Sequence, residues 1–179
     1  SLFRDVRRSG IIALALKKND TLGWVRLVDK GDEVMLFTKK GLALRFFESE
    51  VRLMGRNAAG VRGIRLKSED YLVDCEVVAK QDREGTLLVI SEFGFGKQSP
   101  LKEFKTQKRG GIGIKAMNVS SKTGNMVNTS IVKDAEEFIA VSKKGKTIRS
   151  AIKGIPILGR ATQGVRVMKL EPSDKLYSM

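Results

Sequence analysis

Short runs of alternating apolar and polar residues follow one another along the chain and predict strands rather than helices. Residues 71–78, YLVDCEVV, are an example in which every second side chain would face a core. Turns rich in Gly, Lys, Asn and Asp separate the runs. The predicted strands cover residues 11–16, 24–28, 33–38, 42–46, 61–66, 71–78, 87–91, 101–104, 114–117, 127–132, 138–142, 147–149 and 165–170. No stretch has a convincing helical period, so we expect an all-β protein.

A glycine precedes an alternating run in four places, and these glycines recur at a nearly constant spacing. Gly10, Gly60, Gly111 and Gly164 are separated by 50, 51 and 53 residues. A period of this size, with several short strands in each repeat, indicates a propeller-like array of four-stranded blades. We predict a partial blade at residues 1–30 and blade units at about residues 31–85, 86–135 and 136–179. Because natural proteins avoid bare strand edges, we expect a fragment of a larger array, with units upstream of Ser1.

The charge of the chain narrows the choice of partner. Lys and Arg number 34 against 20 Asp and Glu, which gives a net charge of +14 and favours nucleic acid over an anionic membrane surface. Residues 31–85 carry ten basic and ten acidic side chains, so the excess lies outside this unit. No apolar run is long enough to span a bilayer, and the first residues lack a signal-peptide core. We therefore expect a soluble intracellular protein.

Basic residues gather around the recurring glycine loops. Residues 107–113, QKRGGIG, join two cations to three glycines at one bend, which would bring charge and backbone N–H groups close to a phosphate. If each loop occupies the same place on its blade, the loops form a basic rim that a DNA duplex could follow. The alternative is a solvated charged surface that only keeps the protein in solution. The residues predicted to contact DNA are Arg7, Arg8, Arg56, Arg62, Arg65, Gln107, Lys108, Arg109, Gly110, Gly111, Gly113, Lys115, Arg160 and Arg166.

The residues that most enzymes and metal sites use are nearly absent. The chain has no histidine and one cysteine, which excludes His-dependent triads, the usual zinc sites and an internal disulfide. Cys75 lies in an alternating run and is predicted to face the core as a small apolar side chain. Gly145-Lys146-Thr147 ends like a phosphate-binding P-loop, but Ala140 stands where the first glycine belongs. We expect no catalytic residue, metal or cofactor site in this chain.

Three stretches together carry a resemblance to a known family. Residues 33–37 (EVMLF), 54–66 (MGRNAAGVRGIRL) and 107–113 resemble the C-terminal domain of the DNA gyrase A protein, and the similarity covers essentially the whole chain. Residues 107–113 are similar to the family's gyrase box, Gln-Arg-Arg-Gly-Gly-Lys-Gly. Lys108 replaces an arginine and keeps its charge, whereas Ile112 replaces a lysine and removes one. Since the family's principal box lies in its first blade, we interpret this copy as a secondary one.

The resemblance implies a β-pinwheel, a six-bladed propeller-like disc whose blades exchange strands and whose basic perimeter wraps double-stranded DNA. It also implies a cytoplasmic, chromosome-associated bacterial type II topoisomerase that supercoils DNA negatively with ATP. The partners would be the rest of the gyrase A protein and the gyrase B protein, in an A₂B₂ enzyme whose catalytic tyrosine, magnesium and ATP sites lie outside this chain.

Three alternatives stay open. The corresponding domain of the topoisomerase IV A protein is the nearest, and supercoiling by the full enzyme separates the two. A propeller-type protein-interaction module would explain the repeat but not the charge of +14. An RNA-binding β protein would need exposed aromatic side chains for stacking, and the aromatic share is 6 %.

Overall fold

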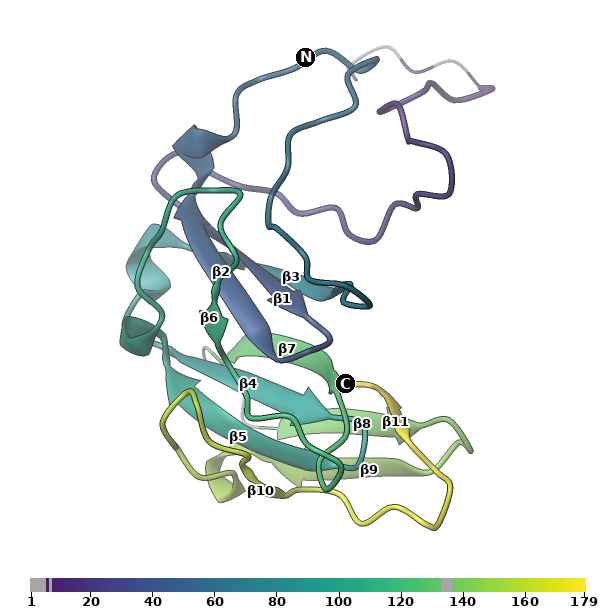
Figure 1. Ribbon diagram of the computed structural model, residues 1–179, viewed down its shortest axis with the longest axis vertical. Coiled ribbons are helices and arrows are strands. Elements are labelled where there is room, and N and C mark those ends of the chain that lie inside the picture. Colours follow the sequence, from purple (N-terminus) through teal and green to yellow (C-terminus); the bar gives the residue numbers. More distant parts are fainter. Residues whose placement is uncertain (1–5, 7, 133–136) are drawn as a thin grey trace.

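In the residues that the structure describes, the chain folds into three antiparallel sheets arranged one after another along its long axis (Figure 1). The computed structural model describes residues 6, 8–132 and 137–179. In these residues the regular structure consists of strands and short 3-10 turns, without an α-helix, as the alternating pattern predicts.

Each sheet has a spatial order that differs from the order of its strands along the chain. The first runs β3 (Leu72–Val78), β1 (Glu33–Thr38), β2 (Leu42–Phe47) and β6 (Ile114–Lys115). The second runs β10 (Val165–Arg166), β5 (Phe95–Pro100), β4 (Thr86–Ser91) and β7 (Met126–Val132). The third runs β11 (Leu176–Ser178), β8 (Glu137–Ser142) and β9 (Thr147–Ala151). The 3-10 turns are η1 (Glu48–Glu50), η2 (Lys80–Asp82), η3 (Leu101–Glu103) and η4 (Ile152–Gly154).

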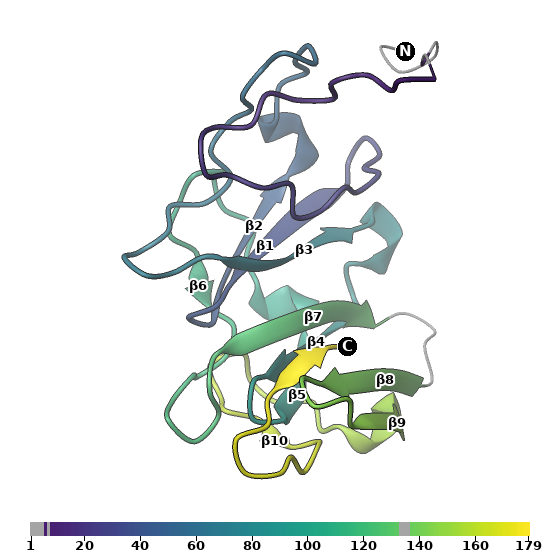
Figure 2. The same cartoon turned by 90° about the vertical axis from the view of Figure 1, so that its right-hand side faces the viewer.

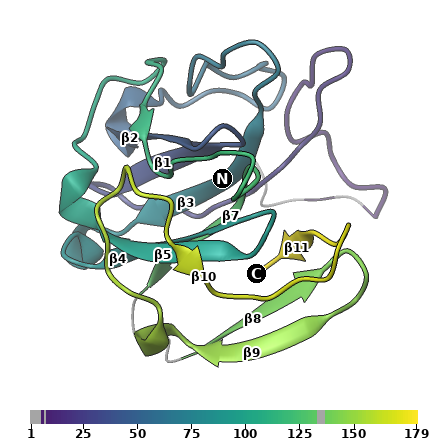
Figure 3. The ribbon, with the colours of Figure 1, turned by 60° about the horizontal axis from the view of Figure 1, so that its bottom comes forward.

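The first two sheets each take one edge strand from the following repeat. β6 pairs with β2, with Ile114 opposite Ala43, and β10 pairs with β5, with Val165 opposite Gly96 (Figure 3). The exchange ties each repeat to the next through backbone hydrogen bonds. It also places the polar loops before β6 and β10 along the outer edge of the neighbouring sheet.

Glycines with a left-handed backbone directly precede β6 and β10, and together with Gly60 they correct the alignment of the repeats. Gly60, Gly113 and Gly164 have φ of +80°, +83° and +81°. Gly111, which the sequence spacing selects, does not have a positive φ. With Gly10 (φ +75°), the equivalent glycines are therefore separated by 50, 53 and 51 residues. The equivalent glycine is the one that has a positive φ and directly precedes the exchanged strand, as Gly113 precedes β6 and Gly164 precedes β10, rather than the one that the count of residues selects.

Figure 2 shows the sheets stacked one above another. Apolar side chains of neighbouring sheets form two clusters between them. β4 lies in the middle and contributes to both, with Leu87 and Val89 in one cluster and Leu88 and Ile90 in the other. Because both faces of β4 are covered, its residues 87–90 are all apolar rather than alternating. A third, smaller cluster covers the outer face of the first sheet, where Cys75 packs half-buried as expected.

Several predicted strands are wrong. Residues 11–16, 24–28 and 61–66 are not strands, and only Val165–Arg166 of the predicted strand at 165–170 is one. Residues 101–103 form η3 rather than a strand, and the strand lies just before them in β5, which the pattern does not predict. The residue pattern does not predict the three-residue strand β11. Alternating apolar and polar residues near a glycine loop predict a segment that could pair as a strand. Pairing also requires the free edge of a neighbouring sheet.

A buried ion pair joins β1 to β2. Glu33, 2 % exposed, lies 2.5 Å from Arg45 Nη2 and 3.1 Å from Arg83 Nε, and it accepts a 2.5 Å hydrogen bond from Thr106 Oγ1. Burial alone would raise the pKa of Glu33, but the hydrogen bonds from Thr106 and Arg45 and the charges of Arg45 and Arg83 outweigh it and lower the pKa. Arg45 Nη1 also donates to the Leu101 carbonyl at 2.8 Å, so the pair supports the second repeat as well.

We expect Glu33→Gln to lower the free energy of unfolding by about 3–5 kcal/mol at pH 7, because it leaves Arg45 buried without a counter-charge. The folded-state pKa lies below the unfolded value of about 4.3, so the stabilisation is complete above about pH 5 and disappears as the pH falls through the folded-state pKa. Urea unfolding at pH 7 and at pH 3 measures both effects. Glu137→Gln, which breaks the exposed pair with Arg149, is the control and should cost less than about 1 kcal/mol. Equal losses for the two variants would contradict the prediction.

Candidate nucleic-acid interface

The polar loops of successive repeats are hydrogen-bonded to one another and form one continuous edge. Residues 8–15, 56–65, 109–118 and 160–169 occupy equivalent places, and we call them the loop rim. Ala15 N–H donates to Ala58 O at 3.4 Å, Arg65 N–H to Gly111 O at 2.8 Å and Asn118 N–H to Thr162 O at 3.0 Å. These three bonds have the same position in the repeat, so the rim is regular as well as continuous.

Three arginines clamp each rim loop to the one before it. The guanidinium Nη1 of Arg56 donates to Ile12 O at 3.1 Å, that of Arg109 to Arg62 O, and that of Arg160 to Lys115 O at 2.8 Å. Each of these arginines is half-buried and lies four residues before a glycine of positive φ. Their charge lies on the rim, but part of their hydrogen-bonding capacity is used within the protein.

Two glutamates hold the backbone of two of the three clamping arginines. The carboxylate of Glu50 accepts the backbone N–H of Arg109 at 2.7 Å, and that of Glu103 accepts the backbone N–H of Arg160 at 2.7 Å. Sequence reasoning missed both acids. The signal was their recurrence in the same 3-10 turn of successive repeats, 59 and 57 residues before the arginine they hold.

A second set of cations points outward. Arg62, Lys115 and Arg166 are exposed, and each lies two residues after a glycine of positive φ. Arg65 and Lys169 are also exposed and are equivalent to each other along the rim. Arg166 lies over the ring of Phe95, 5.4 Å from its centroid, which holds the guanidinium beside the second sheet. The outward set is therefore spaced by the repeat and leaves its charges in solvent.

Known proteins match this sequence and this arrangement. The model of the family "DNA gyrase C-terminal domain, beta-propeller" matches residues 1–29, 32–79, 85–133 and 136–179. The chain belongs to the DNA gyrase C-terminal domain family. The DNA gyrase A protein of Chlamydia pneumoniae is 37 % identical over 179 residues, 99 % of this chain and 21 % of its own length. The protein of the same name from Aminobacterium colombiense is 38 % identical over 174 residues, 97 % of this chain and 21 % of its own length.

Solved structures agree with the family. A gyrase A C-terminal domain superposes with a TM-score of 0.83 at 30 % identity, over 94 % of this chain and 57 % of that one. The C-terminal domain of a DNA topoisomerase IV superposes with a TM-score of 0.90 at 26 % identity, over 99 % of this chain and 55 % of that one. This gyrase-family chain thus has the all-β, propeller-like fold predicted from its repeats. It spans about a fifth of the length of the curated relatives it matches.

The gyrase-box-like stretch is divided between structural and exposed positions. The Gln107 backbone N–H donates to Arg45 O at 2.8 Å and its side-chain amide nitrogen is buried, whereas Lys108 is exposed. Gly110 has φ of +81° and its N–H donates to Gly63 O at 2.7 Å. Gly113 lies against the Ala43 carbonyl. Most of the box therefore shapes the loop. Lys108 is its exposed cation, and Lys115, also exposed, lies two residues beyond the box.

One of the two remaining predicted contacts lies at the first loop of the rim. Arg8 is exposed, next to the glycine loop at Gly10. Arg7 lies outside the described residues. The structure thus brings the cations of residues 56–65, 109–118 and 160–169 together on one edge and adds Arg8 near its end.

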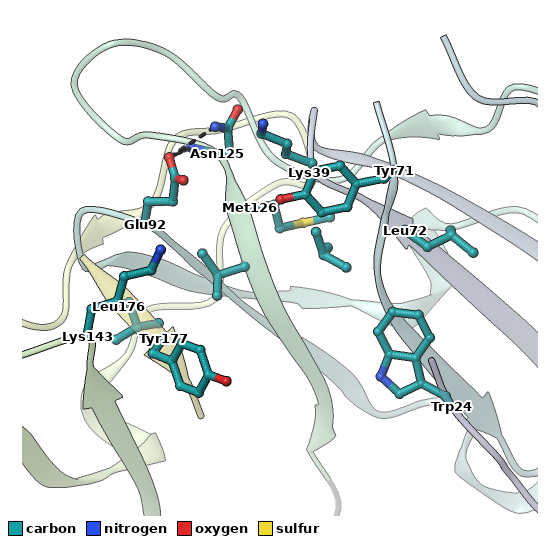
Figure 4. Close-up of a pocket in the computed structure, with 12 residues that line it drawn as sticks. Trp24, Lys39, Tyr71, Leu72, Glu92, Asn125, Met126, Lys143, Leu176 and Tyr177 are labelled. Atoms are coloured by element: carbon teal, nitrogen blue, oxygen red, sulfur yellow. Dashed lines mark hydrogen bonds between the residues drawn. The ribbon is translucent and has the colours of Figure 1, made fainter. Parts of the chain in front are cut away.

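A pocket of about 300 Å³ lies between β3, β7 and β11, at the sheet edges opposite β6 and β10 (Figure 4). Trp24 and the exposed rings of Tyr71 and Tyr177 line it. Glu92 accepts hydrogen bonds from the Asn125 backbone at 2.9 Å and side chain at 3.0 Å. Burial would raise the pKa of Glu92, but these bonds and Lys175 lower it. The pocket's carboxylate is thus already paired.

The described residues hold no group of three or more His, Cys, Asp or Glu side chains that could bind a metal ion. In the same part of the chain, no helix is long and apolar enough to cross a membrane.

Proposed function

We propose that this chain binds double-stranded DNA along the loop rim, without reading its sequence, and bends the duplex around the array. The observation that carries the proposal is the row of exposed cations Arg62, Lys115 and Arg166 on loops that are hydrogen-bonded edge to edge. A phosphate backbone has a regular spacing of charge, and a regular row of cations suits it better than a single cationic pocket.

The contacts expected on this rim are contacts to phosphate rather than to bases. The cations lie on loops and on the two-residue strands β6 and β10, and no α-helix of the described chain is available to enter a major groove. Binding should therefore be nearly independent of sequence and strongly dependent on salt. Further charge around the central row would come from Arg7, Arg8, Arg56, Arg65, Lys108, Arg109 and Arg160.

Wrapping would serve a type II topoisomerase that introduces negative supercoils with ATP. In that enzyme the rest of the gyrase A protein and the gyrase B protein, in an A₂B₂ assembly in the bacterial cytoplasm, would supply the catalytic groups, and this chain would present DNA to them. The gyrase A relatives, of which the chain matches about a fifth, support this role. The chain itself would need neither ATP nor magnesium.

The superposition on the topoisomerase IV domain supports a second candidate, the same rim in the A protein of a topoisomerase IV. ATP-dependent negative supercoiling of relaxed plasmid by the complete enzyme would favour gyrase. Relaxation and decatenation without supercoiling would favour topoisomerase IV.

The test of wrapping is topological. Plasmid is relaxed by a nicking-closing enzyme in the presence of increasing amounts of the chain, and the distribution of linking numbers is read on a gel. A shift that grows with protein and saturates is expected. An unchanged distribution at saturating protein would reject wrapping, and an electrophoretic mobility assay on linear duplex would then show whether simple binding is retained.

A further inference from the structure

A lysine is buried beneath the last described rim loop. Lys97, on β5, has 0 % of its surface exposed and is among the largest fully buried side chains. Its Nζ donates to Gly159 O at 2.7 Å and to Arg160 O at 2.6 Å. Burying a cation costs free energy unless hydrogen bonds or a counter-charge offset the cost, so the two bonds to the loop help to keep Lys97 at this place.

The equivalent positions in the other repeats are apolar. Leu44 and Ile148 lie, like Lys97, three residues after a hairpin glycine of positive φ. Leu44 is fully buried and would contact a Cβ at Gly111, beneath the preceding rim loop. The fold thus accepts an aliphatic side chain at this position, and the packing of the sheet alone does not require lysine.

The hydrogen bonds of Lys97 turn the loop carbonyls away from the rim surface. Its neighbour Ser99 donates to Leu158 O at 2.8 Å, so three successive carbonyls, of residues 158–160, face β5. Glu103 meanwhile accepts the Arg160 N–H. Carbonyl oxygens carry partial negative charge, and turning them inward removes acceptors that would repel a phosphate.

We infer that Lys97 is a positioning residue for DNA binding: it holds the 158–162 loop with its carbonyls inward, and it places a positive charge behind Arg160. The inference rests on the proposed function. Burial, and more weakly the charge of Arg160, lower the pKa of Lys97 to about 8 against the opposing effect of Glu103. Glu103 and Arg160 are the charged groups that face it from η3 and from the loop. The positive charge is present at pH 7 and mostly lost by pH 9.

Two variants separate the lost contacts from a general failure to fold. Lys97→Met keeps the length of the side chain without its donors, and Lys97→Leu introduces the residue found at the equivalent position 44. Lys143→Gln is the control, because it removes one exposed charge from the pocket between β3, β7 and β11. Amide hydrogen exchange of a peptide covering residues 157–164 is compared with one covering residues 107–113, in the 179-residue chain.

Exchange at the Arg160 and Thr162 amides should become about tenfold faster in both Lys97 variants, with residues 107–113 unchanged. Affinity for linear duplex at pH 7 should fall at least about threefold more than in Lys143→Gln, and only the wild type should lose a further factor of about three between pH 7 and pH 9. Unchanged exchange would overturn the inference, whatever the DNA result. Faster exchange with the same affinity loss as the control would also overturn it. If the wild type does not bind DNA at all, the proposed function fails, while the exchange result still decides whether Lys97 positions the loop.

Discussion

Neutralising Arg62, Lys115 and Arg166 together to Gln is expected to weaken binding of linear duplex DNA roughly 100-fold, since each exposed ion pair contributes up to about 1 kcal/mol. Within the described chain these side chains donate no hydrogen bond that holds a rim loop; the clamping arginines supply those bonds. The free energy of unfolding should therefore change little. Fluorescence anisotropy with a labelled duplex, over a series of salt concentrations, measures the loss.

The salt dependence gives a sharper result than the affinity alone. Each phosphate contact adds about −0.9 to the slope of log K against log salt, so three lost contacts should make the slope shallower by about 2.7. The matched control replaces Lys40, Lys143 and Lys144 by Gln. These exposed lysines lie in the hairpin turns after β1 and β8, and the control lowers the net charge of +14 by the same three units. If both triple variants lost the same affinity and slope, the contacts would depend on total charge, and the rim would not be the binding surface.

Gly113→Ala is expected to destabilise the chain by about 2–5 kcal/mol, the sum of a left-handed backbone and a steric clash. The added Cβ would lie 2.5 Å from Ala43 O and 2.9 Å from Ala43 C, at the point where β6 joins β2. Neither group can move without breaking the exchanged strand pair. Urea unfolding measures the loss, and amide exchange at Lys115 should rise because its pairing with Leu42 is disturbed.

Gly145→Ala provides the control for the conformational part of this effect. Gly145 has φ of +82°, almost the same as Gly113, but a Cβ there would meet nothing within 4 Å. It should cost only about 1–2 kcal/mol for the left-handed backbone. A similar loss of unfolding free energy at both positions would contradict the prediction. The contact of Gly113 with the neighbouring strand would then contribute nothing, and the left-handed backbone alone would require the glycine.

The residue pattern predicted the strands β1, β2, β4, β7 and β8 nearly in full, because each of them buries apolar side chains in the clusters between successive sheets. The predictions failed at residues 61–66 and 165–170, which resemble strands in composition. Only Val165–Arg166 has a partner edge, on β5, and it forms a strand. Local alternation reports which face of a segment is apolar, whereas a strand also needs an unpaired edge at the right distance.

The loop rim, too, is predicted only in part by the sequence. Its basic character and its period of about 50 residues follow from the sequence, and so does the family, because the glycine loops and their cations recur in order. The different roles of those cations do not. Arg109 and Lys115 are close in sequence, yet Arg109 clamps a neighbouring loop and Lys115 lies in solvent.

Net charge and the period of the repeats can be obtained from the sequence alone. They were enough to predict an all-β array with a basic edge. The tertiary structure decided which glycine starts each exchanged strand, which arginines are used within the protein, and why Lys97 is buried. Each of these depends on a carbonyl from another repeat, Ala43 O for Gly113, Arg62 O for Arg109 and Gly159 O for Lys97. Folding brings these groups within hydrogen-bonding or van der Waals distance, and no pattern of neighbouring residues encodes that distance.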